Sequence, residues 1–98
     1  MSRRKRVSME TTKRAVMEYL SAEAAPETTI SITRKRISSE TGINLGRLRH
    51  GLKALEEEGL LIARRRLAKE GGGYIANEYE ITAKGLRYLA EGGDNLVG

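Results

Sequence analysis

The sequence predicts a small α+β domain, mainly helical, in the order helix, short strand, helix, helix, β-hairpin and C-terminal helix. Its 98 residues are enough for one domain. Apolar residues recur at helical spacing in several segments, while three short segments have the pattern of strands. A glycine-rich stretch at 70–73 separates the last two of these, as in a hairpin.

The first helix is expected from Ser8 to about Ala24, with Ser8 as its cap. It ends before Pro26, since proline and the residue before it favour extended backbone. The inward face of this helix is expected to comprise Ala15, Val16, Tyr19 and Leu20. Residues 29–32 alternate polar and apolar, which predicts a short, half-buried strand.

Two more helices are expected, one beginning at Thr33 and reaching about residue 40, the other at about 45–58. Gly42 suits the left-handed conformation after the first of them, and Asn44 can cap the second. The buried stripe of the second comprises Leu48, Leu52 and Leu55. Two helices joined by a short glycine-containing turn form a helix-turn-helix.

Residues 60–67 and 74–81 are expected to pair as a hairpin. Alternation in the second strand places Glu78 and Glu80 on one face. The opposite face comprises Ile75, Tyr79 and Ile81. Thr82 can cap a final helix, which is expected to contain Leu86 and Leu89 and to end at Gly92–Gly93.

These elements predict one domain over residues 8–91, a flexible basic arm at 1–7 and a flexible tail at 92–98. The arm contains Arg3-Arg4-Lys5-Arg6, which could enter a minor groove or serve as a solubilising tail. The sequence holds no cysteine, which excludes disulfides and thiolate metal sites. No apolar run is long enough to cross a membrane.

Charge is distributed in blocks along the chain. The formal net charge is +5, and basic blocks at 1–14, 34–53 and 64–69 alternate with acidic stretches. Such blocks favour a polyanionic partner, although they can also be solvated helix faces.

Two stretches carry a resemblance to a known family. The segment 32–61, which includes Gly42-Ile43 and Leu55-Glu56-Glu57-Glu58-Gly59-Leu60-Leu61, resembles the helix-turn-helix of winged-helix transcription regulators. The segment 79–86, Tyr-Glu-Ile-Thr-Ala-Lys-Gly-Leu, resembles the strand-to-helix junction of PadR-like and MarR-like regulators. The resemblance covers about residues 12–90 and implies a winged-helix fold, with the hairpin as the wing, and DNA binding.

The third helix is the candidate reader of DNA. Its outward, N-terminal half is basic, while Glu56, Glu57 and Glu58 make its far end acidic. This polarity opposes the helix dipole, but it suits a recognition helix, which enters the major groove by its N-terminal residues. A solvated face is the alternative. The candidate contacts are Asn44, Gly46, Arg47, Arg49, His50 and Lys53.

Further candidate contacts lie outside this helix. At the start of the second helix, the basic residues expected to meet the DNA backbone are Arg34, Lys35 and Arg36. On the hairpin, the basic residues expected to meet phosphates are Arg64, Arg65, Arg66 and Lys69. The alternative is a cross-strand ladder in which Glu78 and Glu80 neutralise two of these arginines.

Two glycines interrupt the third helix, and each costs roughly 1 kcal/mol relative to alanine. Gly51, near the buried stripe, is expected to permit close packing against the second helix. Gly46 is explained equally by packing and by a close approach of the backbone to DNA.

Catalysis has little support in the sequence. His50 is the only histidine and Asp94 the only aspartate, and no nucleophile–base pair or metal pair is apparent. We therefore expect no enzyme, metal or cofactor, but a cytoplasmic, nucleoid-associated transcription regulator that binds double-stranded DNA as a homodimer. The alternatives are a winged-helix protein–protein adaptor, a plasmid or phage replication or partition protein, and an RNA-binding protein, for which no aromatic platform is visible.

Overall fold

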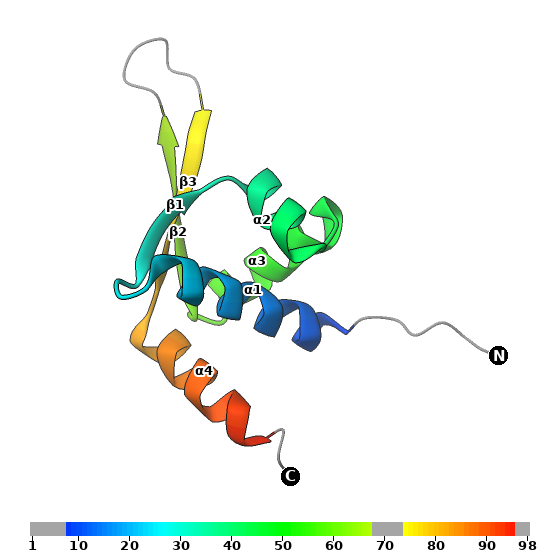
Figure 1. Cartoon of the computed structure of the whole chain (residues 1–98), viewed down its shortest axis with the longest axis vertical. Coiled ribbons are helices and arrows are strands. Elements are labelled where there is room, and N and C mark those ends of the chain that lie inside the picture. Colours follow the sequence, from blue (N-terminus) through cyan, green and yellow to red (C-terminus); the bar gives the residue numbers. More distant parts are fainter. Residues whose placement is uncertain (1–7, 68–73, 96–98) are drawn as a thin grey trace, which may run out of the picture.

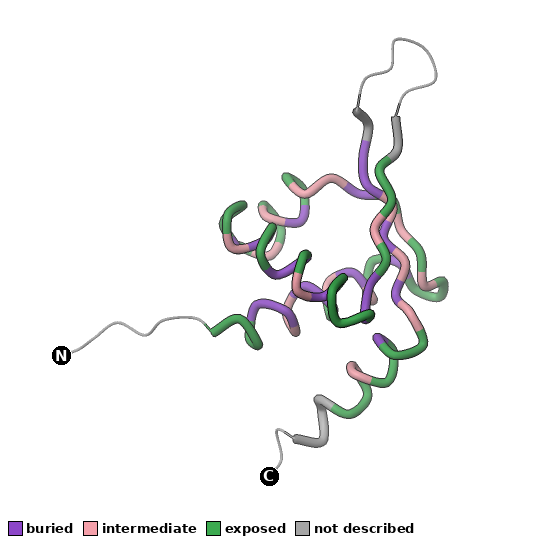
Figure 2. The backbone as a smooth tube through the Cα atoms, turned by 180° about the vertical axis from the view of Figure 1, so that it is seen from behind, coloured by how far each residue is buried: buried purple, intermediate pink, exposed green. Residues whose placement is uncertain are grey.

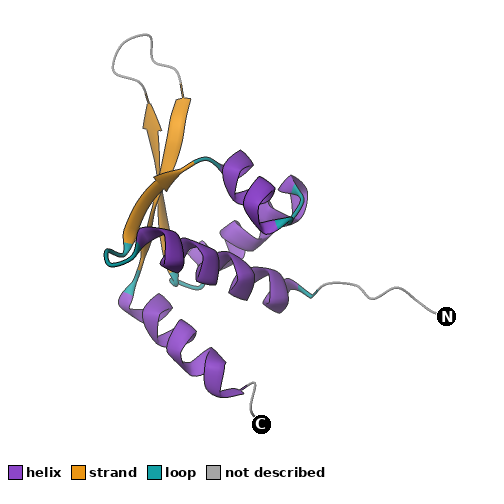
Figure 3. Cartoon of the chain, viewed as in Figure 1, coloured by secondary structure: helices purple, strands orange, loops and turns teal. Residues whose placement is uncertain are grey.

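The computed structural model describes residues 8–67 and 74–95 (Figure 1). In chain order the elements are α1 (Met9–Ala24), β1 (Thr29–Ile32), α2 (Arg34–Thr41), α3 (Leu45–Glu57), β2 (Leu61–Leu67), β3 (Tyr74–Ile81) and α4 (Ala83–Asn95). This order confirms the predicted α+β class (Figure 3). The expected basic arm at 1–7, the loop at 70–73 and the last residues of the tail, 96–98, lie outside the described residues.

Each helix begins after a residue whose side-chain oxygen accepts a backbone N–H of the first turn. These capping residues are Ser8, Thr33, Asn44 and Thr82. Ser8, Asn44 and Thr82 were predicted as caps, whereas Thr33 was expected as the first residue of its helix and lies one position before it. Each cap satisfies one of the N–H groups that have no partner inside the helix. Gly42 and Gly59 follow α2 and α3 with φ of 80° and 79°, a left-handed conformation that favours glycine.

The sheet is antiparallel, and its strands lie in the order β1-β3-β2. β1 pairs with residues 77–80 of β3, whereas β2 pairs with β3 from Tyr74 to Ile81. The β2–β3 hairpin therefore extends beyond β1 at one end of the sheet, and α4 follows from the other end (Figure 1). Helices α1, α2 and α3 lie together on one side of the sheet (Figure 3).

The core lies between these three helices and the sheet (Figure 2). Leu48, Leu52 and Leu55 of α3 are buried, which confirms the predicted stripe. They meet Val16, Met17 and Leu20 of α1, Ile37 of α2, and Tyr79 and Ile81 of β3 in one cluster. Burial of each such aliphatic side chain contributes about 1.5–3 kcal/mol. The side chain of Ile75 lies outside the described part of the chain.

One buried charge links α1 to the end of α3. Lys13 is 7% exposed, and its Nζ donates to Glu58 Oε2 at 2.7 Å and pairs with Glu10 Oε1 at 3.2 Å. The hydrogen bonds to Glu58 raise the pKa of Lys13 despite its partial desolvation. Lys13 is therefore charged and paired inside the helical layer.

The final helix is longer than expected. α4 continues past Gly92 and Gly93 to Asn95, so the prediction that it ends at these glycines is wrong. Glycine lowers helix propensity by about 1 kcal/mol, but unlike proline it keeps its N–H donor and does not clash with the preceding turn.

Candidate nucleic-acid interface

The orientation of α3 is set by its buried stripe and by its cap. Asn44 Oδ1 accepts the Arg47 backbone N–H at 2.9 Å, which fixes the start of the helix. Because Leu48, Leu52 and Leu55 face the core, the opposite side faces solvent. The predicted contact residues Arg49, His50 and Lys53 are all exposed there, and Arg47 on the flank is half-buried.

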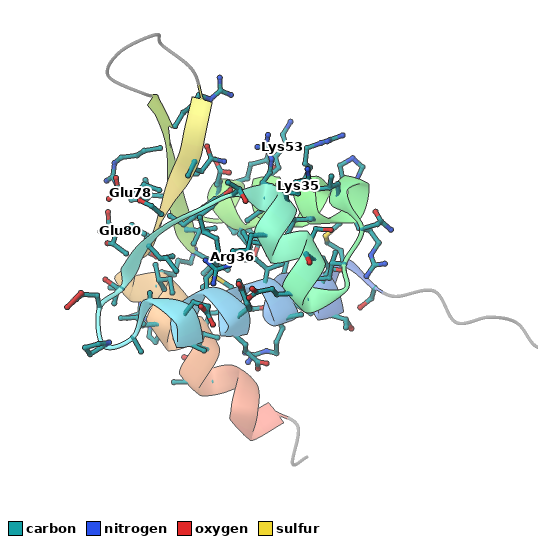
Figure 4. The ribbon with its side chains drawn as sticks, turned by 45° about the horizontal axis from the view of Figure 1, so that its top comes forward. Lys35, Arg36, Lys53, Glu78 and Glu80 are labelled. Atoms are coloured by element: carbon teal, nitrogen blue, oxygen red, sulfur yellow. The ribbon has the colours of Figure 1, made fainter. Side chains whose placement is uncertain are left out.

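Unpaired cations gather on α3 and at the start of α2. We call Arg34, Lys35, Arg47, Arg49 and Lys53 the cationic face. None of them makes an ion pair with any carboxylate whose side chain the structure describes. Figure 4 shows Lys35 and Lys53 extending from the two helices on the same side of the molecule. The structure therefore places Lys35 and Lys53 on one side of the molecule, and it brings Arg34, Arg49 and Lys53 together around one cleft.

Arg47 carries an unmet donor within this face. Its Nε is shielded from solvent and has no hydrogen-bond partner among the described residues. A buried donor without a partner costs about 1–3 kcal/mol.

Four basic residues elsewhere among the described residues are paired with carboxylates, whereas Lys84 and Arg87 make no such ion pair. Arg14 lies 3.0 Å from Glu18 within α1, and Lys13 pairs with Glu58. Arg36, one of the predicted contacts, has its Nε 3.1 Å from Glu40 and its Nη2 3.7 Å from Glu23 of α1. Arg36 therefore lies between α2 and α1, away from Lys35 and Lys53 (Figure 4).

The predicted wing contacts differ in their surroundings. Arg64 Nη2 lies 3.0 Å from Glu80 Oε1, so the expected cross-strand neutralisation occurs for this arginine. Arg65 lies opposite Asn77 in the sheet and is exposed. Arg66 belongs to β2, but its side chain, like the whole of Lys69, lies outside the described residues. Glu78 and Glu80 lie on the side of the sheet away from the helices (Figure 4).

The two glycines of α3 differ in their surroundings. A Cβ on Gly51 would lie 3.0 Å from Thr12 Cγ2, so close packing explains this glycine. The expected partner was α2, which is wrong: α3 crosses α1 at this point, and Thr12 belongs to α1. A Cβ on Gly46 would meet only Asn44 Oδ1, at 3.5 Å, which is an ordinary contact. The fold itself therefore does not require glycine at position 46.

A cleft beside α3 contains residues that the sequence analysis missed. It has a volume of about 340 Å³ and opens between α3, the start of α2 and β3. Among its lining residues are Glu56, Asn77 and Tyr79, none of which was a predicted contact. The sequence could have indicated Asn77, because strand alternation places it on the inward face with Tyr79 and Ile81.

Two kinds of feature are absent from the residues that the structure describes. No group of histidine and carboxylate side chains there could hold a metal ion. No described helix is both long enough and apolar enough to span a bilayer.

Comparison with known proteins identifies the fold. No protein-family model matches the chain, and no curated protein matches its sequence. The structure is similar to that of a MarR-family transcriptional regulator from Silicibacter pomeroyi, with a TM-score of 0.59 and 16% sequence identity. It is also similar to ZitR, a zinc-responsive MarR-family member from Lactococcus lactis, with a TM-score of 0.60 and 22% identity. The fold is a winged helix.

The winged-helix domain corresponds to part of these larger chains. The two matches cover 87% and 95% of this chain but 49% and 55% of theirs, so it spans about half their length. A possible transcriptional regulator from Methanosarcina mazei matches over 83% of this chain, with a TM-score of 0.55 and 21% identity. The expected resemblance to MarR-like winged-helix domains is confirmed at the level of the fold, and the β2–β3 hairpin is the wing.

Proposed function

We propose that this winged-helix domain binds double-stranded DNA as a small transcription regulator. The observation that carries the proposal is the cationic face, whose members lack carboxylate partners in the described part of the chain. Leaving these bases unpaired while Lys13, Arg14, Arg36 and Arg64 are paired concentrates positive charge on one surface. A concentrated positive surface is the electrostatic footprint of a nucleic-acid site.

In this proposal α3 enters the major groove, which is wide enough to admit a helix. The outward residues of its N-terminal half then meet base edges and nearby phosphates, with Gly46 allowing a close approach of the backbone. Arg34 and Lys35 meet the backbone beside the groove, and the wing lies along phosphates through Arg65, Arg66 and Lys69. The structural neighbours support this function, because one is described as a MarR-family transcriptional regulator, one as a MarR-family member and one as a possible transcriptional regulator.

The proposal is tested by the salt dependence of duplex binding. Each phosphate that a Lys or Arg neutralises should contribute about −0.9 to the slope of log affinity against log salt. A labelled duplex titrated between about 50 and 200 mM salt should therefore lose affinity steeply, because several Lys and Arg residues of the cationic face and the wing neutralise phosphates. Absence of binding even at low salt would reject the DNA proposal and favour a protein–protein adaptor.

We further propose that the regulator acts as a homodimer in the cytoplasm, built from the terminal helices. Leu86 on α4 is 44% exposed, and α4 extends away from the helical layer (Figure 1). Arg14 donates to the Tyr88 carbonyl at 2.8 Å, and the Tyr88 hydroxyl contacts Glu10, so α4 is anchored to α1 while Leu86 stays accessible. A two-fold pair would place the α3 helices about 34 Å apart, one turn of duplex.

The dimer should dissociate when a charged side chain replaces Leu86 in the proposed apolar contact. We expect Leu86→Glu to sediment as a monomer at micromolar concentration, because the interface would have to bury an unpaired carboxylate. Arg87→Glu, at the neighbouring exposed position, is the control and should remain a dimer. A wild-type protein that is monomeric both alone and on DNA would contradict the proposal.

A further inference from the structure

The cleft beside α3 combines a cationic rim with a polar floor. Three bases of the cationic face line it: Arg34, Arg49 and Lys53. On its inner side Asn77 and Tyr79 are 7% and 1% exposed, and the Asn77 side-chain amide donates to the Tyr79 hydroxyl at 2.8 Å. This hydrogen bond holds the two β3 side chains that form the floor of the cleft in place.

One lining residue has the opposite charge. Glu56 follows Lys53 by one helical turn and lines the same cleft. It makes no ion pair of 4.0 Å or less with Arg34 or with any other base whose side chain is described. Partial burial raises the pKa of the Glu56 carboxyl, while the Arg34 guanidinium acts in the opposite direction. Glu56 is an exposed residue, so its carboxylate lies at the solvent edge of the cleft, within reach of the field of Arg34.

We propose that this cleft receives a backbone phosphate of the bound duplex, held by Arg34 and Lys53, and that Glu56 opposes this phosphate and so limits affinity for every DNA sequence alike. The proposal rests on the DNA-binding function proposed above. A strand that follows the groove occupied by α3 passes beside the helix on the wing side, where the cleft opens. The phosphate gains two cations there, but it must approach a carboxylate, which weakens the contact.

Removing the carboxylate should therefore tighten binding. We expect Glu56→Gln to raise affinity about fivefold for both the preferred and a scrambled duplex, the effect of one like-charge pair a few ångström apart in water. The matched control is Glu57→Gln, which removes the same charge from the next residue, an exposed position that does not line the cleft. It should change affinity much less. Thermal melts establish that both variants fold.

A second pair of measurements tests which cation is involved. Lys53→Ala should weaken binding to all duplexes and flatten the salt slope by about one unit. In the Lys53→Ala background, the gain from Glu56→Gln should shrink, because the phosphate is no longer held against the carboxylate. Equal gains from Glu56→Gln and Glu57→Gln, with duplex binding intact, would overturn this inference and leave the proposed function standing. Loss of all duplex binding by the wild type would overturn both.

The alternative occupant of the cleft is a free phosphate or a small phosphate-bearing ligand, which would contact the same cations. Millimolar inorganic phosphate, added without DNA at constant ionic strength, should leave the amide resonances around Asn77 and Glu56 unchanged. Saturable shifts at these amides would assign the cleft to a small phosphate-bearing ligand and would overturn the assignment to a DNA strand.

Discussion

Gly85→Ala should lower the free energy of unfolding by about 3 kcal/mol, because the added methyl group has no space. Its Cβ would lie 2.3 Å from the Leu60 carbonyl oxygen, 2.9 Å from Ile81 Cγ2 and 3.0 Å from Met17 Cε. The first of these is a backbone atom that already accepts the Thr82 N–H at 3.2 Å, so it cannot move without loss of that bond. The junction of the sheet with α4 would have to open.

The matched control is Gly46→Ala, the same substitution in a helix with space for the methyl group. Its nearest atom would be Asn44 Oδ1 at 3.5 Å, so we expect unchanged stability or a gain of up to about 1 kcal/mol. Thermal and denaturant unfolding of both variants checks the pair, and Gly85→Ala should melt about 12 °C or more below the wild type. Similar melting temperatures for the two variants would show that α4 does not pack as the structure describes.

Local signals account for most of what the sequence predicts of this fold. A cap such as Asn44 and a turn glycine such as Gly42 act within a few residues, and the Leu48–Leu52–Leu55 stripe has a period that only a helix presents on one face. Contacts between distant segments carry no such signal. Lys13 and Glu58 are 45 residues apart, and their pairing follows from how α1 crosses the end of α3.

The same limit applies to the candidate site. In the sequence, Arg36 and Lys35 are equally good candidates, because both are basic residues at the start of the second helix. In the structure, Arg36 is paired with Glu40 and Glu23, while Lys35 has no carboxylate partner of 4.0 Å or less among the described side chains. The cleft could not be predicted either, because its lining comes from α2, α3 and β3, which are distant in the sequence. Glu56 was assigned only to the acidic end of a helix, and its place beside Arg34 and Lys53 appears once the chain folds.

Arg49→Ala should reduce the preference for the best site over scrambled DNA by about 5- to 150-fold, equivalent to about 1–3 kcal/mol. The reason is geometric: Arg49 is exposed in the N-terminal half of α3, the part of a recognition helix that reaches base edges. A guanidinium can donate two hydrogen bonds to a guanine, and no other base offers the same pair of acceptors in the major groove. Without these bonds the wrong base pair is penalised less.

The wing supplies the comparison for this prediction. Arg65→Ala should weaken all duplexes similarly and flatten the salt slope by about one unit, since a phosphate contact carries no sequence information. Neither residue is part of the buried stripe of α3, so both variants should stay folded. Each variant is measured on the preferred and the scrambled duplex at one salt concentration. If alanine at Arg47, Arg49 and His50 in turn leaves the affinity ratio unchanged, α3 does not read the sequence, and specificity must come from the wing or from the N-terminal arm.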